Sequence, residues 1–190
     1  MLQNLPQSSS EWVETVLSDF DAFLLDHAAC ERKASAMAMS FVMRYPDRTQ
    51  ILDPMIVLAR EELTHFHRVF RICIERGLRF SKDTKDPYVN GLLKLTRNGR
   101  DEEFLDRLVF AAVVEARGHE RFGCIAEALP DGDLKDFYAE ITRSEERHAE
   151  IFLDLASGYF AAEKIEERLR FFLDAEAALL PRLPLRAALH

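Results

Sequence analysis

Two short strings in this sequence each place a glutamate and a histidine three residues apart. They are Glu62 with His65, and Glu145 with His148. On an α-helix, residues at this spacing project from the same face, so each string presents one carboxylate and one imidazole together. These groups are common ligands of iron and other transition metals. The strings therefore predict a metal site that is built on helices.

A further glutamate lies upstream of each string in a helical stretch. Glu31 precedes Glu62 by 31 residues, and Glu115 precedes Glu145 by 30 residues. The two halves of the chain therefore repeat one pattern, a glutamate followed about 30 residues later by a Glu-x-x-His string. Four carboxylates and two imidazoles from four helices form the ligand set that di-iron carboxylate bundles project into their cores. The sequence thus predicts a dinuclear iron centre, in which one glutamate of each string bridges the metals. The predicted ligands are Glu31, Glu62, His65, Glu115, Glu145 and His148.

The position of these residues along their helices supports the prediction. With 19 glutamates and six histidines in 190 residues, about 0.6 Glu-x-x-His pairs arise by chance. However, Glu31 and Glu62 lie 13 and 14 residues from the turn expected between their helices, and Glu115 and Glu145 repeat this relation. All four therefore lie about 20 Å from a turn. The alternative is a set of ordinary helices with ion-paired surfaces.

The helices that must position these residues follow from apolar spacing and from stop signals. Ser8 and Glu11 have the spacing of a capping box, and Asp19 marks the place of any break in the first helix. Asp47 is the expected cap of the second helix, in which Pro54 indicates a late start or a kink. The predicted helices span about 12–43, 47–76, 88–95, 101–128, 133–157 and 160–179.

The connection between residues 77 and 100 is the longest in the chain. A link of this length lets the third long helix start at the end of the bundle where the first began, which is the ferritin-like crossover. We therefore predict an all-α, ferritin-like four-helix bundle with a long crossover and an additional C-terminal helix. Residues 1–190 should form one domain, with the bundle at about 10–157 and the extra helix, at about 160–179, packed outside it.

Composition limits the cellular setting. At 190 residues and 48% apolar composition, the chain can bury the core of one domain. Cys30, Cys73 and Cys124 are isolated, which argues against both a disulfide framework and a rubredoxin-type centre. We find no secretion signal and no apolar run of about 18 residues, so we expect a soluble cytoplasmic protein without a membrane partner. The oligomeric state is left open.

Charge is distributed unevenly along the chain. The net charge of −8 argues against a nucleic-acid partner, but residues 68–100 carry nine basic and only three acidic side chains. This segment either contacts phosphates or is simply a solvated loop and helix end. Charge alone favours neither interpretation.

Three further side chains lie near the strings in the sequence. His119 follows Glu115 by four residues and could approach the metals, although the ligand set already has two imidazoles. His67 lies two residues from His65 and points elsewhere. Tyr138 has either a redox role or, more simply, a hydroxyl partner in the core. The nearest candidates to orient the ligand histidines are Glu61, Glu146 and Arg147.

Longer strings resemble known families. Residues 145–148, EERH, resemble the E-x-R-H element of bacterial di-iron monooxygenases and ribonucleotide reductase small subunits, whereas Thr64 replaces the arginine in the first string. A closer resemblance covers most of the chain. The following strings resemble the tRNA 2-methylthio-N6-isopentenyladenosine hydroxylase family: DHAACERKA at 26–34, REELTHFHR at 60–68, VVEARGHERF at 113–122 and SEERHAEIF at 144–152.

This resemblance implies a ferritin-like di-iron monooxygenase whose ligands fall on the six positions given above. The implied reaction uses two iron ions, with dioxygen as co-substrate, to hydroxylate the isopentenyl group of the modified adenosine beside the anticodon of tRNA. The chain has no dinucleotide fingerprint or iron–sulfur cysteine set, so a separate reductase or ferredoxin is implied as electron donor. The basic segment then supplies the expected tRNA contacts: Arg76, Arg79, Lys82, Lys85, Lys94, Arg97 and Arg100.

The sequence leaves two alternatives open. The same six ligands serve a ferritin or rubrerythrin-like iron oxidase or peroxide scavenger. Against this stand the absence of rubredoxin-type cysteine pairs and the long basic crossover. The second alternative is a metal-free helical adaptor, which iron analysis of the purified protein would identify.

Overall fold

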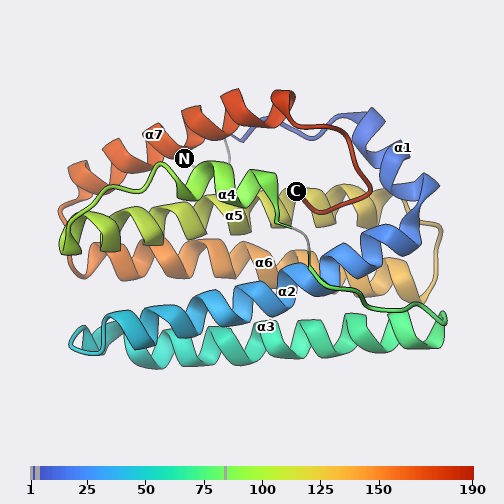
Figure 1. Cartoon of the computed structure of the whole chain (residues 1–190), viewed down its shortest axis with the longest axis horizontal. Coiled ribbons are helices and arrows are strands. Elements are labelled where there is room, and N and C mark those ends of the chain that lie inside the picture. Colours follow the sequence, from blue (N-terminus) through green and yellow to red (C-terminus); the bar gives the residue numbers. More distant parts are fainter. Residues whose placement is uncertain (1, 3–4, 84) are drawn as a thin grey trace. The chain divides into compact units, whose positions relative to one another are not determined.

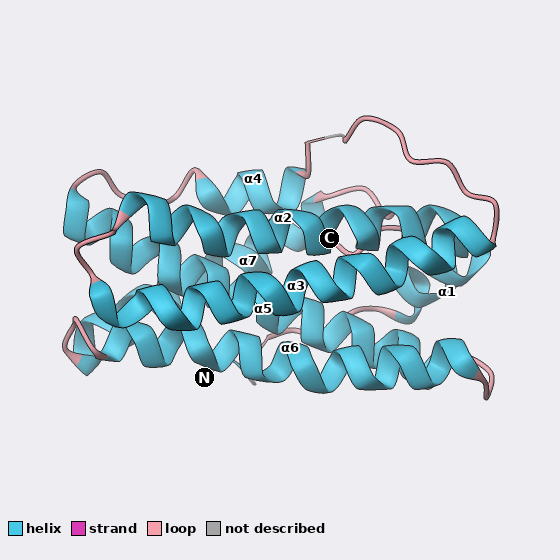
Figure 2. Ribbon diagram, turned by 90° about the horizontal axis from the view of Figure 1, so that it is seen from below, coloured by secondary structure: helices cyan, strands magenta, loops and turns pink. Residues whose placement is uncertain are grey.

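The computed structural model describes residues 2, 5–83 and 85–190, and all of the regular structure in that part of the chain is helical (Figure 2). The chain divides into two compact units. Unit 1 contains Met1–Val13, Lys85–Leu185 and His190, and unit 2 contains Glu14–Thr84 and Arg186–Leu189. That residues 1–190 act as one domain stays a prediction.

Unit 2 is a helical hairpin. Its helices α2 (Phe20–Arg44) and α3 (Thr49–Glu75) lie side by side and are joined by a short turn (Figure 1). The preceding helix α1 (Ser10–Ser18) ends just before Asp19, whose side chain accepts a hydrogen bond from the backbone N–H of Ala22 at 3.2 Å. Asp19 therefore caps α2, and the expected break in the first helical run is confirmed.

Two predicted caps are wrong by one residue. Ser9, not Ser8, caps α1, because its Oγ accepts a hydrogen bond from the N–H of Trp12 at 3.1 Å. The Ser8 hydroxyl instead donates to Glu120 at 2.7 Å, a partner far away in the sequence. Asp47 does not cap α3, since the N-cap is Arg48, which makes no side-chain capping bond.

The start and end of α3 show two local backbone rules. Pro54 lies inside the first two turns of α3, which begins at Thr49, so of the two interpretations, a late start or a kink, the late start is wrong. At the other end, Gly77 has a positive φ of 74° and donates its N–H to Ile74, while Leu78 donates to Cys73. This pair of bonds is the Schellman motif, which favours glycine because it has no Cβ to clash.

Unit 1 is a second hairpin with two helices packed on it. Its hairpin helices are α5 (Arg100–Ala128) and α6 (Asp133–Ser157), while α4 (Pro87–Leu93) and α7 (Ala162–Leu179) pack against α5 (Figure 1). A short 3-10 turn, Leu180–Arg182, follows α7. Asp86 caps α4 by accepting a hydrogen bond from the backbone N–H of Tyr88 at 2.8 Å. The predicted bounds of all these helices are correct to within two residues.

Buried ion pairs attach the outer helix and the crossover to α5. Asp106 is fully buried and accepts hydrogen bonds from Arg168 of α7 at 2.7 Å and from Arg97 of the crossover at 2.8 Å. A buried carboxylate needs such partners to offset the loss of hydration. These contacts fix the end of the crossover where α5 begins.

A second buried network lies further along α5. Arg117 and Glu176 of α7 are both fully buried and lie 2.7 Å apart. Arg117 also donates to the carbonyl of Pro6 and to Glu120, at 2.7 and 2.8 Å, and Tyr88 of α4 donates to Glu176 at 3.3 Å. Burial lowers the pKa of Arg117, but the hydrogen bond and charge of Glu176 outweigh it and raise that pKa above its usual value. Four segments of unit 1 therefore meet at one charged pair.

Candidate metal centre

Unit 2 brings together three of the predicted ligands. Glu31 comes from α2, and Glu62 and His65 come from α3; none is more than 7% exposed. Nδ1 of His65 lies 3.5 Å from Oε2 of Glu31 and 3.6 Å from Oε2 of Glu62. Two carboxylates and one imidazole therefore converge inside this hairpin, as the helical spacing predicts.

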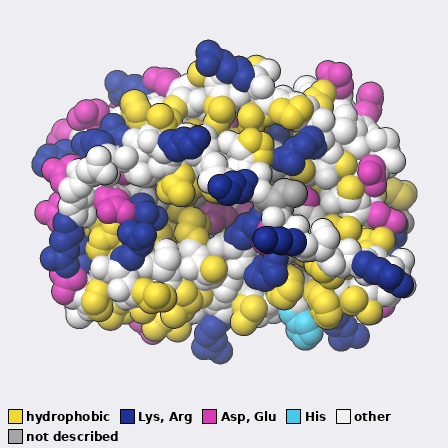
Figure 3. Space-filling model, viewed as in Figure 1, with side chains coloured by type: hydrophobic (Ala, Val, Ile, Leu, Met, Phe, Trp, Pro, Cys, Tyr) yellow, Lys and Arg dark blue, Asp and Glu magenta, His cyan; other side chains and the backbone are white. Residues whose placement is uncertain are grey.

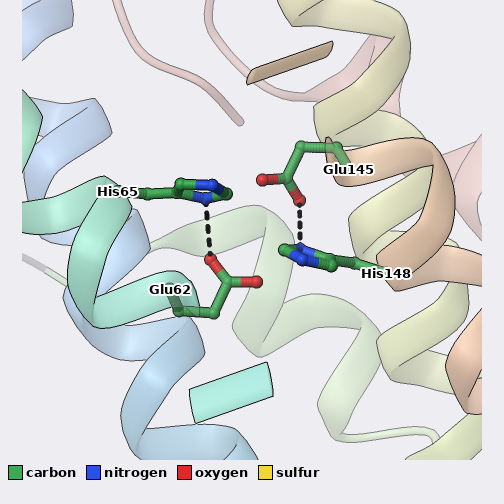
Figure 4. A group of neighbouring side chains, drawn as sticks. All are labelled: Glu62, His65, Glu145 and His148. Atoms are coloured by element: carbon green, nitrogen blue, oxygen red, sulfur yellow. Dashed lines mark hydrogen bonds and ion pairs between the residues drawn. The ribbon is translucent and has the colours of Figure 1, made fainter. Parts of the chain in front are cut away.

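Unit 1 carries the other three predicted ligands in the same arrangement along its hairpin. Glu115 lies in α5, and Glu145 and His148 lie in α6, and all three are buried. Nδ1 of His148 is 3.2 Å from Oε2 of Glu145. Figure 4 shows this pair and the Glu62–His65 pair, each joined by a dashed line. Each unit thus carries one glutamate opposite one Glu-x-x-His string.

The repeat extends to the bonds that hold each hairpin together. In unit 2, the Ser35 hydroxyl donates to the carbonyl of Ala59 at 2.7 Å. In unit 1, Nδ1 of His119 donates to the carbonyl of Thr142 at 2.8 Å. Each donor follows the first-helix glutamate by four residues, and each acceptor precedes the second-helix glutamate by three. These bonds fix the register of the two helices, and they give His119 a structural role.

The other side chains considered near the strings differ in how far they are buried. His67 is exposed, and Tyr138 is fully buried with its ring packed against Phe122 and Phe137. Among the candidates to orient the ligand histidines, Glu61 is half-buried, whereas Glu146 and Arg147 are exposed. The sequence interpretation missed Ser144, whose Oγ lies 3.5 Å from Nε2 of His148 and from Nη2 of Arg147. That distance is at the weak limit for a hydrogen bond.

A fully buried histidine was also missed. His27 lies on α2, and its Nε2 is 2.6 Å from Oε1 of Glu31. The signal was available in the sequence, because His27 precedes Glu31 by four residues and so shares its helix face.

The basic residues suggested for tRNA contact fall into two groups. Arg76 forms an ion pair with Asp21 at 2.6 Å, and Arg97 binds Asp106, so both have structural partners. All seven are exposed, including the other five: Arg79, Lys82, Lys85, Lys94 and Arg100. Figure 3 shows lysine and arginine side chains standing among apolar ones on the face in view.

The donor types in each unit fit iron. Each unit offers two carboxylates and one imidazole, a set that is rich in oxygen and nitrogen and whose two negative charges would balance one divalent metal ion. All six side chains are buried, as expected of ligands that are shielded from bulk water. Within the part of the chain that the structure describes, no helix is long and apolar enough to cross a membrane.

Comparison with known proteins identifies the family of this chain. The family model described as tRNA-(MS[2]IO[6]A)-hydroxylase (MiaE) matches residues 2–190. The tRNA 2-(methylsulfanyl)-N(6)-isopentenyladenosine(37) hydroxylase of Pseudomonas putida is 34% identical over 169 residues, which cover 89% of this chain and 82% of the relative. The enzyme of the same name from Salmonella typhimurium is also 34% identical, over 92% of this chain and 66% of that protein.

A solved structure extends the likeness to the fold. It is described as protein 43 with aldehyde deformylating oxygenase activity from Synechococcus, and it is 33% identical to this chain with a TM-score of 0.91. The match covers 97% of this chain and 91% of that chain. The predicted all-α, ferritin-like fold class is therefore confirmed. Since the family model spans almost the whole sequence, the chain belongs to the tRNA-(MS[2]IO[6]A)-hydroxylase (MiaE) family.

Proposed function

We propose that this protein hydroxylates the isopentenyl group of 2-methylthio-N6-isopentenyladenosine in tRNA, beside the anticodon, and that it uses a non-haem di-iron centre. The observation that carries this proposal is the buried Glu/His donor set in a chain that belongs to a tRNA hydroxylase family. The family match favours this activity over an iron oxidase, a peroxide scavenger or a metal-free adaptor.

In the proposed centre, each unit supplies half of the ligands. Two iron ions would be held by Glu31, Glu62, His65, Glu115, Glu145 and His148. When bound, the iron would supply the activation of dioxygen that hydroxylation of the allylic C–H bond requires. The protein orients the carboxylates and keeps water away from the reacting atoms. Fully buried apolar side chains lie one turn from the α6 ligands, namely Ile141 before Glu145 and Phe152 after His148.

We infer that tRNA binds through exposed basic side chains of the crossover, residues 77–100. Arg79, Lys82, Lys85 and Lys94 are exposed, and no ion pair joins them to the residues that the structure describes. Such side chains can neutralise phosphates without first breaking an internal contact. An external reductase or ferredoxin is proposed as the electron donor, because each hydroxylation consumes two electrons besides those of the C–H bond.

The Synechococcus relative favours a second candidate substrate class. Its description states aldehyde deformylating oxygenase activity, and its similarity to this chain covers nearly the full length. An aliphatic aldehyde is therefore the alternative substrate for the same metal centre. It would need the apolar surroundings of the site but not the basic crossover.

A direct comparison of substrates tests the proposal. The iron-loaded chain is given dioxygen and a reductant, together with either prenylated tRNA or a long-chain aldehyde. We expect mass spectrometry of digested tRNA to show one added oxygen on the isopentenyladenosine, and no conversion of the aldehyde. Conversion of the aldehyde alone would move the assignment to the second candidate. An iron-loaded chain that modifies neither substrate would favour an oxidase or peroxidase, and a chain that takes up no iron would favour the adaptor.

Charge reversal in the crossover tests the tRNA surface. In the Arg79→Glu, Lys82→Glu double variant, we expect tRNA affinity to fall and the slope of log affinity against log salt to drop by about two, because two phosphate contacts are lost. Fluorescence titration at several salt concentrations measures both quantities, and iron content should not change. Arg143→Glu, at an exposed site on α6, is the matched control. Equal tRNA affinity in wild type and double variant would contradict this surface.

A further inference from the structure

The buried imidazole of His27 contacts a proposed ligand from inside α2. It is fully buried, and its ring packs on that of Phe23 with the centroids 6.1 Å apart. Its Nε2 approaches Oε1 of Glu31 to 2.6 Å. A hydrogen bond at this distance to a carboxylate is short and strong, and the packing of the ring fixes the direction of the bond.

This contact divides the two oxygens of Glu31 between two imidazoles. Oε1 lies against His27, while Oε2 lies 3.5 Å from Nδ1 of His65. If the Glu31 carboxylate rotated about its last side-chain torsion, its Oε1 would lose the hydrogen bond to His27. His27 therefore keeps Oε2 directed toward His65, where the other unit 2 donors converge.

The second hairpin has no counterpart of His27. Glu115 takes the place of Glu31 in the repeat, and the residue four positions before it is Ala111, which is fully buried. An alanine side chain has no polar atom to donate. The two glutamates that the repeat makes equivalent are thus supported differently by the preceding helical turn.

We propose that His27 is a positioning residue that orients Glu31 and makes the metal position served by Glu31 the tighter of two inequivalent positions. This inference rests on the proposed metal centre. It attributes the difference between the two metal positions of that centre to His27. His27 acts through Glu31 and not as a ligand, because its Nε2 is already directed at Oε1.

Binding of Co²⁺ to the metal-free full-length chain tests this role without an activity assay. Wild type should bind two Co²⁺ ions in two distinguishable steps. In His27→Phe, which keeps a buried ring but has no donor, the tighter step should weaken by about 10- to 100-fold, the usual effect of losing a group that orients a ligand. In His27→Gln, the amide nitrogen can stand near the place of Nε2, so most of the affinity should return. His67→Phe, at the exposed histidine of α3, is the matched control.

Thermal unfolding of the same metal-free variants separates orientation from folding. A purely structural role would lower the melting temperature of His27→Phe and leave the Co²⁺ affinity of the folded protein unchanged, which would overturn the inference. Loss of one whole Co²⁺ equivalent in both His27 variants would also overturn it, because it would identify His27 as a ligand. If wild type itself bound no Co²⁺, the metal centre and this inference would both fall. Two Co²⁺ in wild type with unchanged affinity in His27→Phe would remove only the inference.

Discussion

Replacement of His148 with alanine should reduce the iron content from two ions per chain to one or fewer, and should lower tRNA hydroxylation by more than about 100-fold, because a lost ligand costs at least as much as a lost orienting group. His148 is fully buried at 3.2 Å from Glu145. Removal of its imidazole leaves the neighbouring carboxylate without the partner that should complete one metal position. Iron analysis of the reconstituted variant, together with the nucleoside assay, measures both effects.

His67→Ala controls for the loss of an imidazole from a proposed ligand helix. His67 is exposed on α3, two residues after His65, so this variant should keep full iron and full activity. Circular dichroism of metal-free His148→Ala should show the helical content of wild type, since each hairpin has its own apolar contacts and register bonds. Full iron and full activity in His148→Ala would remove His148 from the ligand set.

The second large effect is expected at the buried pair of unit 1. Glu176→Gln should lower the free energy of unfolding by up to about 3–5 kcal/mol, because it removes the fully buried counter-charge of the Arg117 guanidinium and leaves only the less buried Glu120 to balance it. Arg117 and Glu176 are both fully buried and 2.7 Å apart. Denaturant unfolding monitored by circular dichroism measures this loss.

A double variant tests whether the lost stability comes from leaving one charge unpaired or from losing a favourable contribution of the Arg117–Glu176 pair itself. Arg117→Met combined with Glu176→Leu should recover most of the lost stability, since apolar groups of similar volume avoid the desolvation cost of both ions. Arg143→Met, at an exposed position on α6, should change stability by no more than about 0.5 kcal/mol. A Glu176→Gln variant as stable as wild type would show that this pair does not hold α7 to α5.

The long helices and the proposed ligands followed from local rules. Apolar spacing placed α3 and its Glu-x-x-His string, and Glu31 and Glu115 lie at the predicted distances from the ends of their helices. Local spacing suffices here because residues three or four apart on a helix must share a face. The cap assigned to Ser8 was wrong because a distant partner, Glu120, competes for its hydroxyl.

Long-range polar contacts were the part that local patterns did not reveal. Glu176 continues the buried apolar stripe of Ile165, Leu169 and Phe172 on α7, which is an unusual position for a carboxylate. The stripe indicates a buried charge, but only the fold identifies Arg117 as its partner, 59 residues away. Arg97 was likewise interpreted as an RNA contact, because its acceptor Asp106 looks like one more acid of a helix surface.

Isotopically heavy dioxygen tests the central claim most directly. The iron-loaded protein is supplied with reductant, prenylated tRNA and labelled dioxygen in ordinary water, and the digested nucleosides are analysed by mass spectrometry. The account predicts that one labelled oxygen atom enters the isopentenyl group, and that none enters with Glu145→Ala. Label-free hydroxylation, with the oxygen drawn from water, or an unmodified nucleoside from a protein that holds two iron ions, would contradict it.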